Sequence, residues 1–387
     1  MTSMGNWFVT LSGVVALAAG CSGSPQVNPN GTGGTNQGTG GQNAGFGGAA
    51  GATGGSKAGT GGTSLAGGGC ARVSGVAHPF APSSPWNTPT PANTQWYDVD
   101  VLHHCYENCM DSDGLRHWWV GTDVGITWSS PCDPLWTFTL PAYTADDWHR
   151  TRAAATLQMH APSTLAPEPP DADSDRIVLV ADPVTGNYIE IWSSTVDASS
   201  RTVTGQVWAT DNMVTGQGVG DASRNLNAGV RASNFSWAAG NITQADLSAG
   251  KIDHALEITL PLDMLAGGSQ GSGPYRAPAT SGNGDTGHGP IVMGSKIGIP
   301  ADKSMPTGLS SIGIMVFNAL KTYGAYVGDG GGADKPVIGA DGPSMGLAQG
   351  IGIDSTPFEP LIAFWSHGGS ADMEKIGPLL RVADYQP

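Results

Sequence analysis

The sequence predicts a mostly β fold, a single jelly-roll-like β-sandwich with a few short helices. Short runs of β-branched and aromatic residues recur, and Gly, Pro, Asn and Asp interrupt them at close intervals. Only two segments carry helix signals, one from its capping residues and one from apolar residues at helical spacing. No low-complexity segment interrupts residues 70–387, so we expect this part of the chain to form one domain.

The strand signals are clearest in the first half of this domain. Trp136–Leu140 alternates aromatic or aliphatic residues with threonine. Arg176–Ala181 is apolar at successive positions, which is typical of a central strand buried on both faces. A Pro- and Gly-containing turn at 182–187 leads into Tyr188–Ser193, and Arg201–Thr210 follows. Together the last three strands are predicted to form a meander.

Both predicted helices have recognisable ends. The first spans Thr243 to Ala249, with Asp246 placed to complete a capping box and Gly250 placed to end the helix. The second runs from about Ser310 to Tyr323 and is followed by a glycine. Two short strands, 325–327 and 379–382, are expected after it.

The N-terminal segment resembles the export signal of bacterial lipoproteins. An apolar run over residues 7–20 has the length of a signal-peptide core, and the small residues 18–20 directly precede Cys21. This pattern is similar to a lipobox. The resemblance implies cleavage after residue 20, acylation of Cys21 with palmitate-type chains, and, with Ser22 next, an outer-membrane or cell-surface location. An ordinary cleaved secretory signal is the alternative.

Residues 21–69 differ in composition from the rest of the chain. They are rich in Gly, Thr, Asn and Ser, and they predict a flexible tether with a root-mean-square span of about 40 Å. The whole chain has a net charge of −15, and every acidic residue follows the tether. This charge argues against nucleic acid as a partner. We expect a monomer that meets the membrane through its lipid anchor alone.

The cysteines indicate an oxidising compartment. If Cys21 is acylated, an even number remains, and in an exported chain we expect disulfides. A metal site is the alternative, because two histidines adjoin this cysteine-rich stretch, but the spacing matches no common zinc pattern. We therefore expect no metal and no cofactor. The four cysteines are Cys70, Cys105, Cys109 and Cys132.

Alternation predicts a polar and aromatic face across two neighbouring strands. If Ile189 and Ile191 are buried together with Val203 and Val207, the opposite face gathers aromatic rings, a carboxylate and an amide. Such a face suits sugar rings. The alternative is that this face forms a second buried core layer. The residues of the predicted sugar-binding face are Tyr188, Glu190, Trp192, Thr204, Gln206 and Trp208.

Candidate catalytic groups are spread along the chain. Hydrolysis of a glycan needs two carboxylates across a groove, for which Glu190, Asp253 and Glu257 are available. A lyase instead needs a base beside a cation, which Tyr323 or His254 and Arg231 could supply. A buried Arg231 would need a carboxylate partner, for which Asp253 is the candidate. His254 shares a face with aliphatic residues, so a hydrogen-bonded core histidine is the alternative to a catalytic one.

Four short motifs occur along the domain: Ser84–Asn87, Arg231–Ser233, Ile252–Leu256, and Leu320–Tyr326 followed by Asp329. Together they resemble a family of secreted bacterial and fungal proteins that has no established activity. The resemblance implies a secreted β-rich fold and action on polysaccharide.

These observations predict a surface-anchored, carbohydrate-active protein. As an enzyme it would be a glycoside hydrolase or a polysaccharide lyase. The alternative is a non-catalytic lipoprotein that binds glycans or serves an adhesive or structural role. In either case the expected partner is a polysaccharide.

Overall fold

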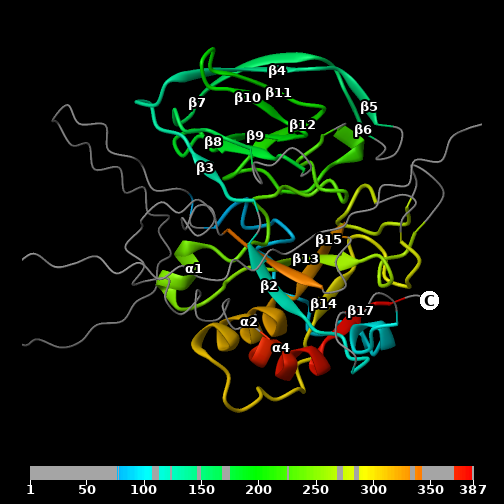
Figure 1. Cartoon of the computed structure of the whole chain (residues 1–387). Coiled ribbons are helices and arrows are strands. Elements are labelled where there is room, and N and C mark those ends of the chain that lie inside the picture. The colour runs from blue at the N-terminus through cyan, green and yellow to red at the C-terminus, as the bar shows by residue number, and fades with distance from the viewer. Residues whose placement is uncertain are drawn as a thin grey trace, which may run out of the picture. The chain divides into compact units, whose positions relative to one another are not determined.

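The computed structural model in Figure 1 describes residues 76, 78–106, 113–122, 124–145, 150–167, 175–224, 226–267, 273–282, 287–331, 336–341 and 370–385. The predicted signal peptide and tether lie outside these residues, as do Cys21, Cys70 and Cys109. Within the described part of the chain, no helix has both the length and the apolar character that crossing a membrane requires.

Two four-stranded sheets pack face to face in the upper part of Figure 1. We call them the outer and the inner sheet. The outer sheet has the order β10 (Thr195–Asp197), β11 (Thr202–Thr204), β4 (Leu135–Leu140), β7 (Ala155–His160). The inner sheet has the order β12 (Val207–Asn212), β9 (Asn187–Trp192), β8 (Val178–Ala181), β3 (Thr127–Trp128).

Alternation along the strands builds the core between these two sheets. In β4, Trp136, Phe138 and Leu140 are buried, whereas the residues between them are half-buried or exposed. Ile189 and Ile191 of β9 meet them from the inner sheet. The other face of the inner sheet is also buried, against a second and larger core. The inner sheet is therefore a middle layer, and the prediction of a central strand at 176–181 is confirmed by β8.

A seven-stranded mixed sheet forms the lower part of the molecule in Figure 1. Its central strands β13 and β15 are parallel, and α2 (Ser311–Thr322) directly precedes β15. The sheet order is β1 (Trp96–Tyr97), β17 (Arg381–Ala383), β14 (Lys296–Gly298), β15 (Ala325–Gly331), β13 (Leu256–Pro261), β16 (Val337–Ala340), β2 (Trp119–Thr122). A separate pair joins β5 (Tyr143–Ala145) to β6 (Arg150–Arg152).

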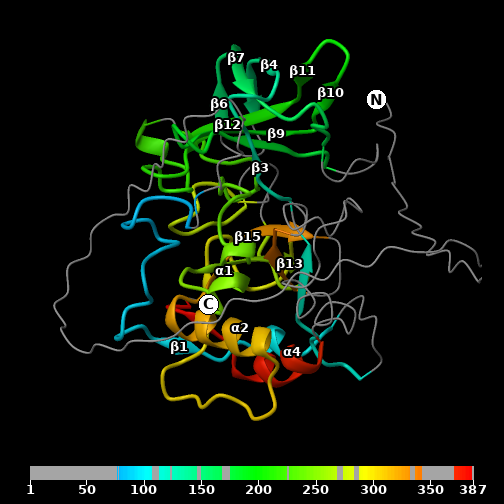
Figure 2. The ribbon, with the colours of Figure 1, turned by 90° about the vertical axis from the view of Figure 1, so that its left-hand side faces the viewer.

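Helices cover the far side of the seven-stranded sheet. In both views α2 and α4 (Ser370–Ile376) lie on the opposite side of this sheet from the two four-stranded sheets (Figure 2). The predicted capping box of α1 (Gln244–Ala249) is present, and Gly250 ends the helix in the left-handed conformation. Ser310 caps α2, as its sequence suggests. Short 3₁₀ turns are η1 (Asp100–Leu102), η3 (Ala222–Arg224) and η4 (Gly377–Leu379).

The predicted mostly β fold, with sandwich-like sheets and a few short helices, is confirmed. The predicted meander is also present as the antiparallel neighbours β8, β9 and β12. The prediction of one strand over Arg201–Thr210 is wrong. The chain crosses from the outer to the inner sheet at Gly205, where a Cβ atom would collide with the Ile191 side chain. This segment therefore forms β11 and β12, which belong to different sheets.

Candidate functional site

Glu190, a predicted catalytic residue, lies in the dry interior. Its carboxylate accepts hydrogen bonds from the backbone N–H of Val230 at 3.1 Å and of Trp237 at 2.9 Å, and from the Ser236 hydroxyl. Burial raises the pKa of Glu190 to about 7, although these donors and Arg231 act in the opposite direction. Because no solvent reaches it, Glu190 cannot act on a polymeric substrate, and its predicted catalytic role is wrong.

Arg231 is also fully buried, and its partner is not the predicted one. Its guanidinium lies 3.3 Å from a carboxylate oxygen of Glu257 and stacks on the ring of Trp237, with 3.7 Å between the guanidinium carbon and the ring centroid. Asp253 instead pairs with Lys251 at the surface. The predicted pairing of Arg231 with Asp253 is wrong, because Glu257 lies within β13 and faces the interior.

His254 is a hydrogen-bonded core histidine, the alternative that alternation suggested. Its Nδ1 lies 2.9 Å from the carbonyl of Ala255, and its Nε2 lies 3.1 Å from Asp246 of the capping box. Burial alone would lower the pKa of His254, but Asp246 and the carbonyl outweigh it, so the pKa is raised. Both ring nitrogens face acceptors, so the imidazole is engaged within the fold. Its predicted catalytic role is therefore wrong.

Tyr323 is the last of the predicted catalytic residues, and it does not lie in the interior with Glu190, Arg231 and His254. It follows α2 directly, as its C-terminal cap, and is half-buried. Burial, and then the charge of Asp253, raise the pKa of its hydroxyl. The predicted residues therefore do not meet in one cleft: Glu190, Arg231 and His254 are interior, whereas Asp253 and Tyr323 are at the surface.

The predicted sugar-binding face does not exist as a surface. Tyr188 is buried and its hydroxyl donates to the carbonyl of Ala228. Trp208 lies opposite Ile191 in the inner sheet. It therefore points into the core between the two four-stranded sheets, away from Glu190. Trp192 is half-buried and its indole N–H donates to Asp175. The prediction of an exposed face from alternation was wrong because both faces of the inner sheet are covered.

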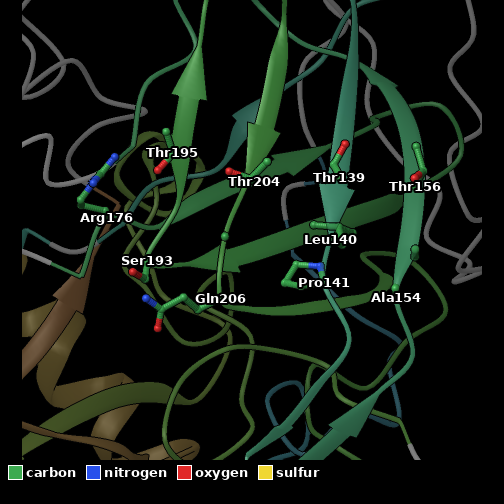
Figure 3. Close-up of a pocket in the computed structure, with 12 residues that line it drawn as sticks. Thr139, Leu140, Pro141, Ala154, Thr156, Arg176, Ser193, Thr195, Thr204 and Gln206 are labelled. Atoms are coloured by element: carbon green, nitrogen blue, oxygen red, sulfur yellow. The ribbon is translucent and has the colours of Figure 1, made fainter.

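Two residues of the predicted sugar-binding face, Thr204 and Gln206, line the same hollow. This hollow has a volume of about 780 Å³ and lies on the outer sheet (Figure 3). We call it the threonine hollow. It is lined mainly by hydroxyl, amide and small apolar side chains, with one cation. Its polar lining includes Thr139, Thr156, Thr195, Thr204, Gln206 and Arg176.

A second hollow, of about 620 Å³, gathers the titratable side chains that a reaction needs. We call it the histidine pocket. It lies between residues 98–104 and 113–117 on one side and the C-terminal elements α4, η4 and β17 on the other. Its titratable lining includes His103, His117, Asp98, Asp113, Glu374 and Arg381.

Local backbone pairing places the two histidines. The N–H of Cys105 donates to the carbonyl of Gly114, and the N–H of Arg116 donates to the carbonyl of His103, which sets residues 103–105 beside 114–116. The buried Trp118 anchors this segment, because its indole N–H donates to the carbonyl of Leu102 at 3.0 Å. Cys105 and Cys132 are each disulfide-bonded, which confirms the prediction for these two cysteines.

Each of the two imidazoles is held by a carboxylate. Nε2 of His103 lies 2.7 Å from Asp98, and Nε2 of His117 lies 3.1 Å from Asp113. The guanidinium of Arg381 lies 3.0 Å from Asp98 and 3.4 Å from Nε2 of His103. The N–H of Leu115 and then His117 lower the pKa of Asp113, so this group remains a carboxylate. The pocket thus presents two oriented imidazoles beside a fixed cation.

Part of the histidine pocket could be recognised in the sequence. The predicted metal-site alternative already singled out the His103–His104 pair, but not His117, Asp98 or Arg381, which the fold brings to it. Within the described residues, no group of three His, Cys, Asp or Glu side chains is arranged to hold a metal ion. The chain matches no protein-family model, no curated protein and no solved structure.

Proposed function

We propose that this protein is a surface lipoprotein that cleaves a uronate-containing polysaccharide by elimination in the histidine pocket. The observation that supports it best is the group formed by His103, Asp98 and Arg381. Asp98 accepts from Nε2 of His103, and Nδ1 makes no hydrogen bond within the described residues. Nδ1 therefore keeps a lone pair that can take a proton.

Elimination uses these groups without a cofactor. Arg381 pairs with the carboxylate of the uronate and makes the neighbouring C5 proton more acidic. Nδ1 of His103 removes that proton, the electron pair forms the C4–C5 double bond, and the C4–O4 bond breaks. His117 gives a proton to the leaving O4 oxygen. The products are one unsaturated chain end and one new hydroxyl.

Hydrolysis fits this pocket less well. It needs two carboxylates that are free to act as acid, base or nucleophile. Asp98 is engaged by His103 and Arg381, and Asp113 is engaged by His117. Of the described carboxylates that line the pocket, this leaves Glu374, which has no hydrogen-bond or ion-pair partner among the described residues. Asp98 and Asp113 position the two imidazoles. In the proposed reaction the imidazoles, and not the carboxylates, act as base and acid.

The test is a substrate panel with a matched pair of variants. The full chain, purified in mild detergent, is incubated with polygalacturonate, alginate and a neutral glucan. Ultraviolet absorbance of unsaturated products and release of reducing ends are read together. The wild-type protein should give both signals on a uronate polymer and neither on the glucan. His103→Gln should reduce the rate by about 100-fold or more.

The control variant is His78→Gln, which alters an exposed histidine outside the pocket and should keep wild-type activity. Reducing ends without ultraviolet absorbance would show hydrolysis and overturn the elimination. Silence on every polymer would leave the alternative of a non-catalytic glycan-binding or adhesive lipoprotein. The lipid anchor at Cys21, the cell-surface location and the monomeric state belong to the same proposal.

A further inference from the structure

The outer sheet presents a row of threonine hydroxyls on its exposed face. Thr195 of β10, Thr204 of β11, Thr139 of β4 and Thr156 of β7 are cross-strand partners in one register. All four are exposed. Because neighbouring strands lie about 4.8 Å apart, the row extends over about 14 Å. The row borders the threonine hollow, as Figure 3 shows from Thr195 to Thr156.

The rest of the hollow supplies apolar contact and hydrogen-bond donors. Leu140, Pro141 and Ala154 line it beside the threonine row, and Ser193 and Gln206 add a hydroxyl and an amide. A sugar ring offers the same mixture, with hydroxyls on its rim and C–H groups on its faces. The volume of about 780 Å³ is within the range of sites that enclose small ligands.

The electrostatics of the hollow differ from those of the chain. The chain has a net charge of −15, yet no described residue that lines the hollow is acidic. Its one cation is Arg176, which forms no ion pair within the described residues. The hollow therefore holds a cation that can pair with an anionic group of a ligand.

The backbone holds Arg176 at this place. Its φ of 50° is in the left-handed region, which non-glycine residues seldom adopt. The N–H and the hydroxyl of Ser194 both donate to its carbonyl, at 2.9 and 2.7 Å. Two hydrogen bonds therefore fix an uncommon conformation of the residue whose side chain lines the hollow.

We propose that the threonine hollow is a separate binding site for an acidic saccharide, with Arg176 on a uronate carboxylate and the threonine row and Gln206 on sugar hydroxyls. It would hold a polymer chain on the outer sheet while cleavage occurs at the histidine pocket, which is built from other elements. The inference shares its substrate class with the proposed function and in that respect rests on it.

Affinity electrophoresis tests the site with cleavage disabled. The His103→Gln chain is run in native gels that contain polygalacturonate or the same polymer fully methyl-esterified, which differ in the carboxylate charge. Retardation is expected with the acid form only. Adding Arg176→Gln should weaken binding about tenfold or more, because a charge-assisted hydrogen bond is lost. Thr204→Val removes one hydroxyl at nearly constant shape and should weaken binding several-fold.

Arg201→Gln is the matched control, since Arg201 is an exposed arginine in the turn of the same sheet and does not line the hollow. It should bind as the parent chain does. Equal retardation by both polymers, or unchanged binding by Arg176→Gln and Thr204→Val, would overturn the inference. Cleavage of short uronate oligomers without retardation would refute this site alone. Retardation without cleavage by the wild-type chain would refute the proposed function alone.

Discussion

Replacing Glu190 with Gln tests whether the buried carboxylate is a structural group that the fold keeps at a raised pKa. Glu190 receives hydrogen bonds from the N–H groups of Val230 and Trp237 and from the Ser236 hydroxyl. A glutamine retains one carbonyl oxygen but turns an NH₂ group towards one of the two N–H donors. One buried donor then loses its acceptor, which costs about 1–3 kcal/mol.

The pH dependence has a sign that follows from the raised pKa. Between pH 4.5 and about 7 the native state holds a proton on Glu190 that the unfolded state has lost. The stabilisation is therefore complete below pH 4.5 and declines as the pH rises through about 7. Over this window the wild-type free energy of unfolding should fall by about 3 kcal/mol, at about 1.4 kcal/mol per pH unit. The glutamine variant has no such group.

Urea unfolding at pH 5 and pH 8, followed by tryptophan fluorescence, measures the difference. At pH 5 Glu190→Gln should be less stable than the wild type by about 1–3 kcal/mol. At pH 8 this difference should vanish or reverse, because the wild type alone has lost about 3 kcal/mol. Asp302→Asn, at an exposed position, should show no change of gap between the two pH values. An equal deficit of Glu190→Gln at both pH values would refute the reasoning.

Two further predictions concern other parts of the chain. The raised pKa of His254 gives stability that is present below pH 6.5 and is lost as pH rises through the folded pKa, whereas the lowered pKa of Asp246 gives stability that is lost in acid. His254→Asn should therefore lower the melting temperature more at pH 5.5 than at pH 8.5, and an equal drop at both would contradict the pair's role. Cys21→Ala should move the protein from the membrane fraction to the soluble fraction, and a chain that stays in the membrane fraction would count against the lipid anchor.

Features set by neighbouring residues could be predicted from the sequence. The capping box of α1 needs only Thr243 and Asp246, and Gly250 ends the helix because it adopts the left-handed conformation without strain. The buried set of β4 follows from alternation within one strand. These interactions act over a few residues, so the order of residues determines them.

The partner of each strand could not be predicted in the same way. Val203 and Val207 have the spacing of one continuous strand, yet Thr204 pairs with Thr139 of the outer sheet and Trp208 pairs with Ile191 of the inner sheet. The change of sheet at Gly205 depends on how closely the two sheets approach, which is a property of the packed core. This change of sheet, together with the covering of both faces of the inner sheet, is why the prediction of a sugar-binding face was wrong.

The histidine pocket depends on the same kind of long-range order. Asp98 and Arg381 stand far apart in the sequence and 3.0 Å apart in the fold. The strand pairs β1–β17 and β14–β17 bring the C-terminal residues to this end of the seven-stranded sheet. The His103–His104 pair was visible in the sequence as a chemical cluster, but its carboxylate and its cation come from elements whose pairing no local pattern indicates.

Buried charged residues join three parts of this chain. Arg231, Glu257 and Glu190 connect the segment after η3 to the inner sheet on one side and to β13 on the other, and all three side chains are buried. Removing one partner of a buried ion pair is strongly destabilising, so these residues serve the fold. The proposed activity requires titratable groups that reach solvent, and among the described residues the histidine pocket brings oriented imidazoles and a cation together there.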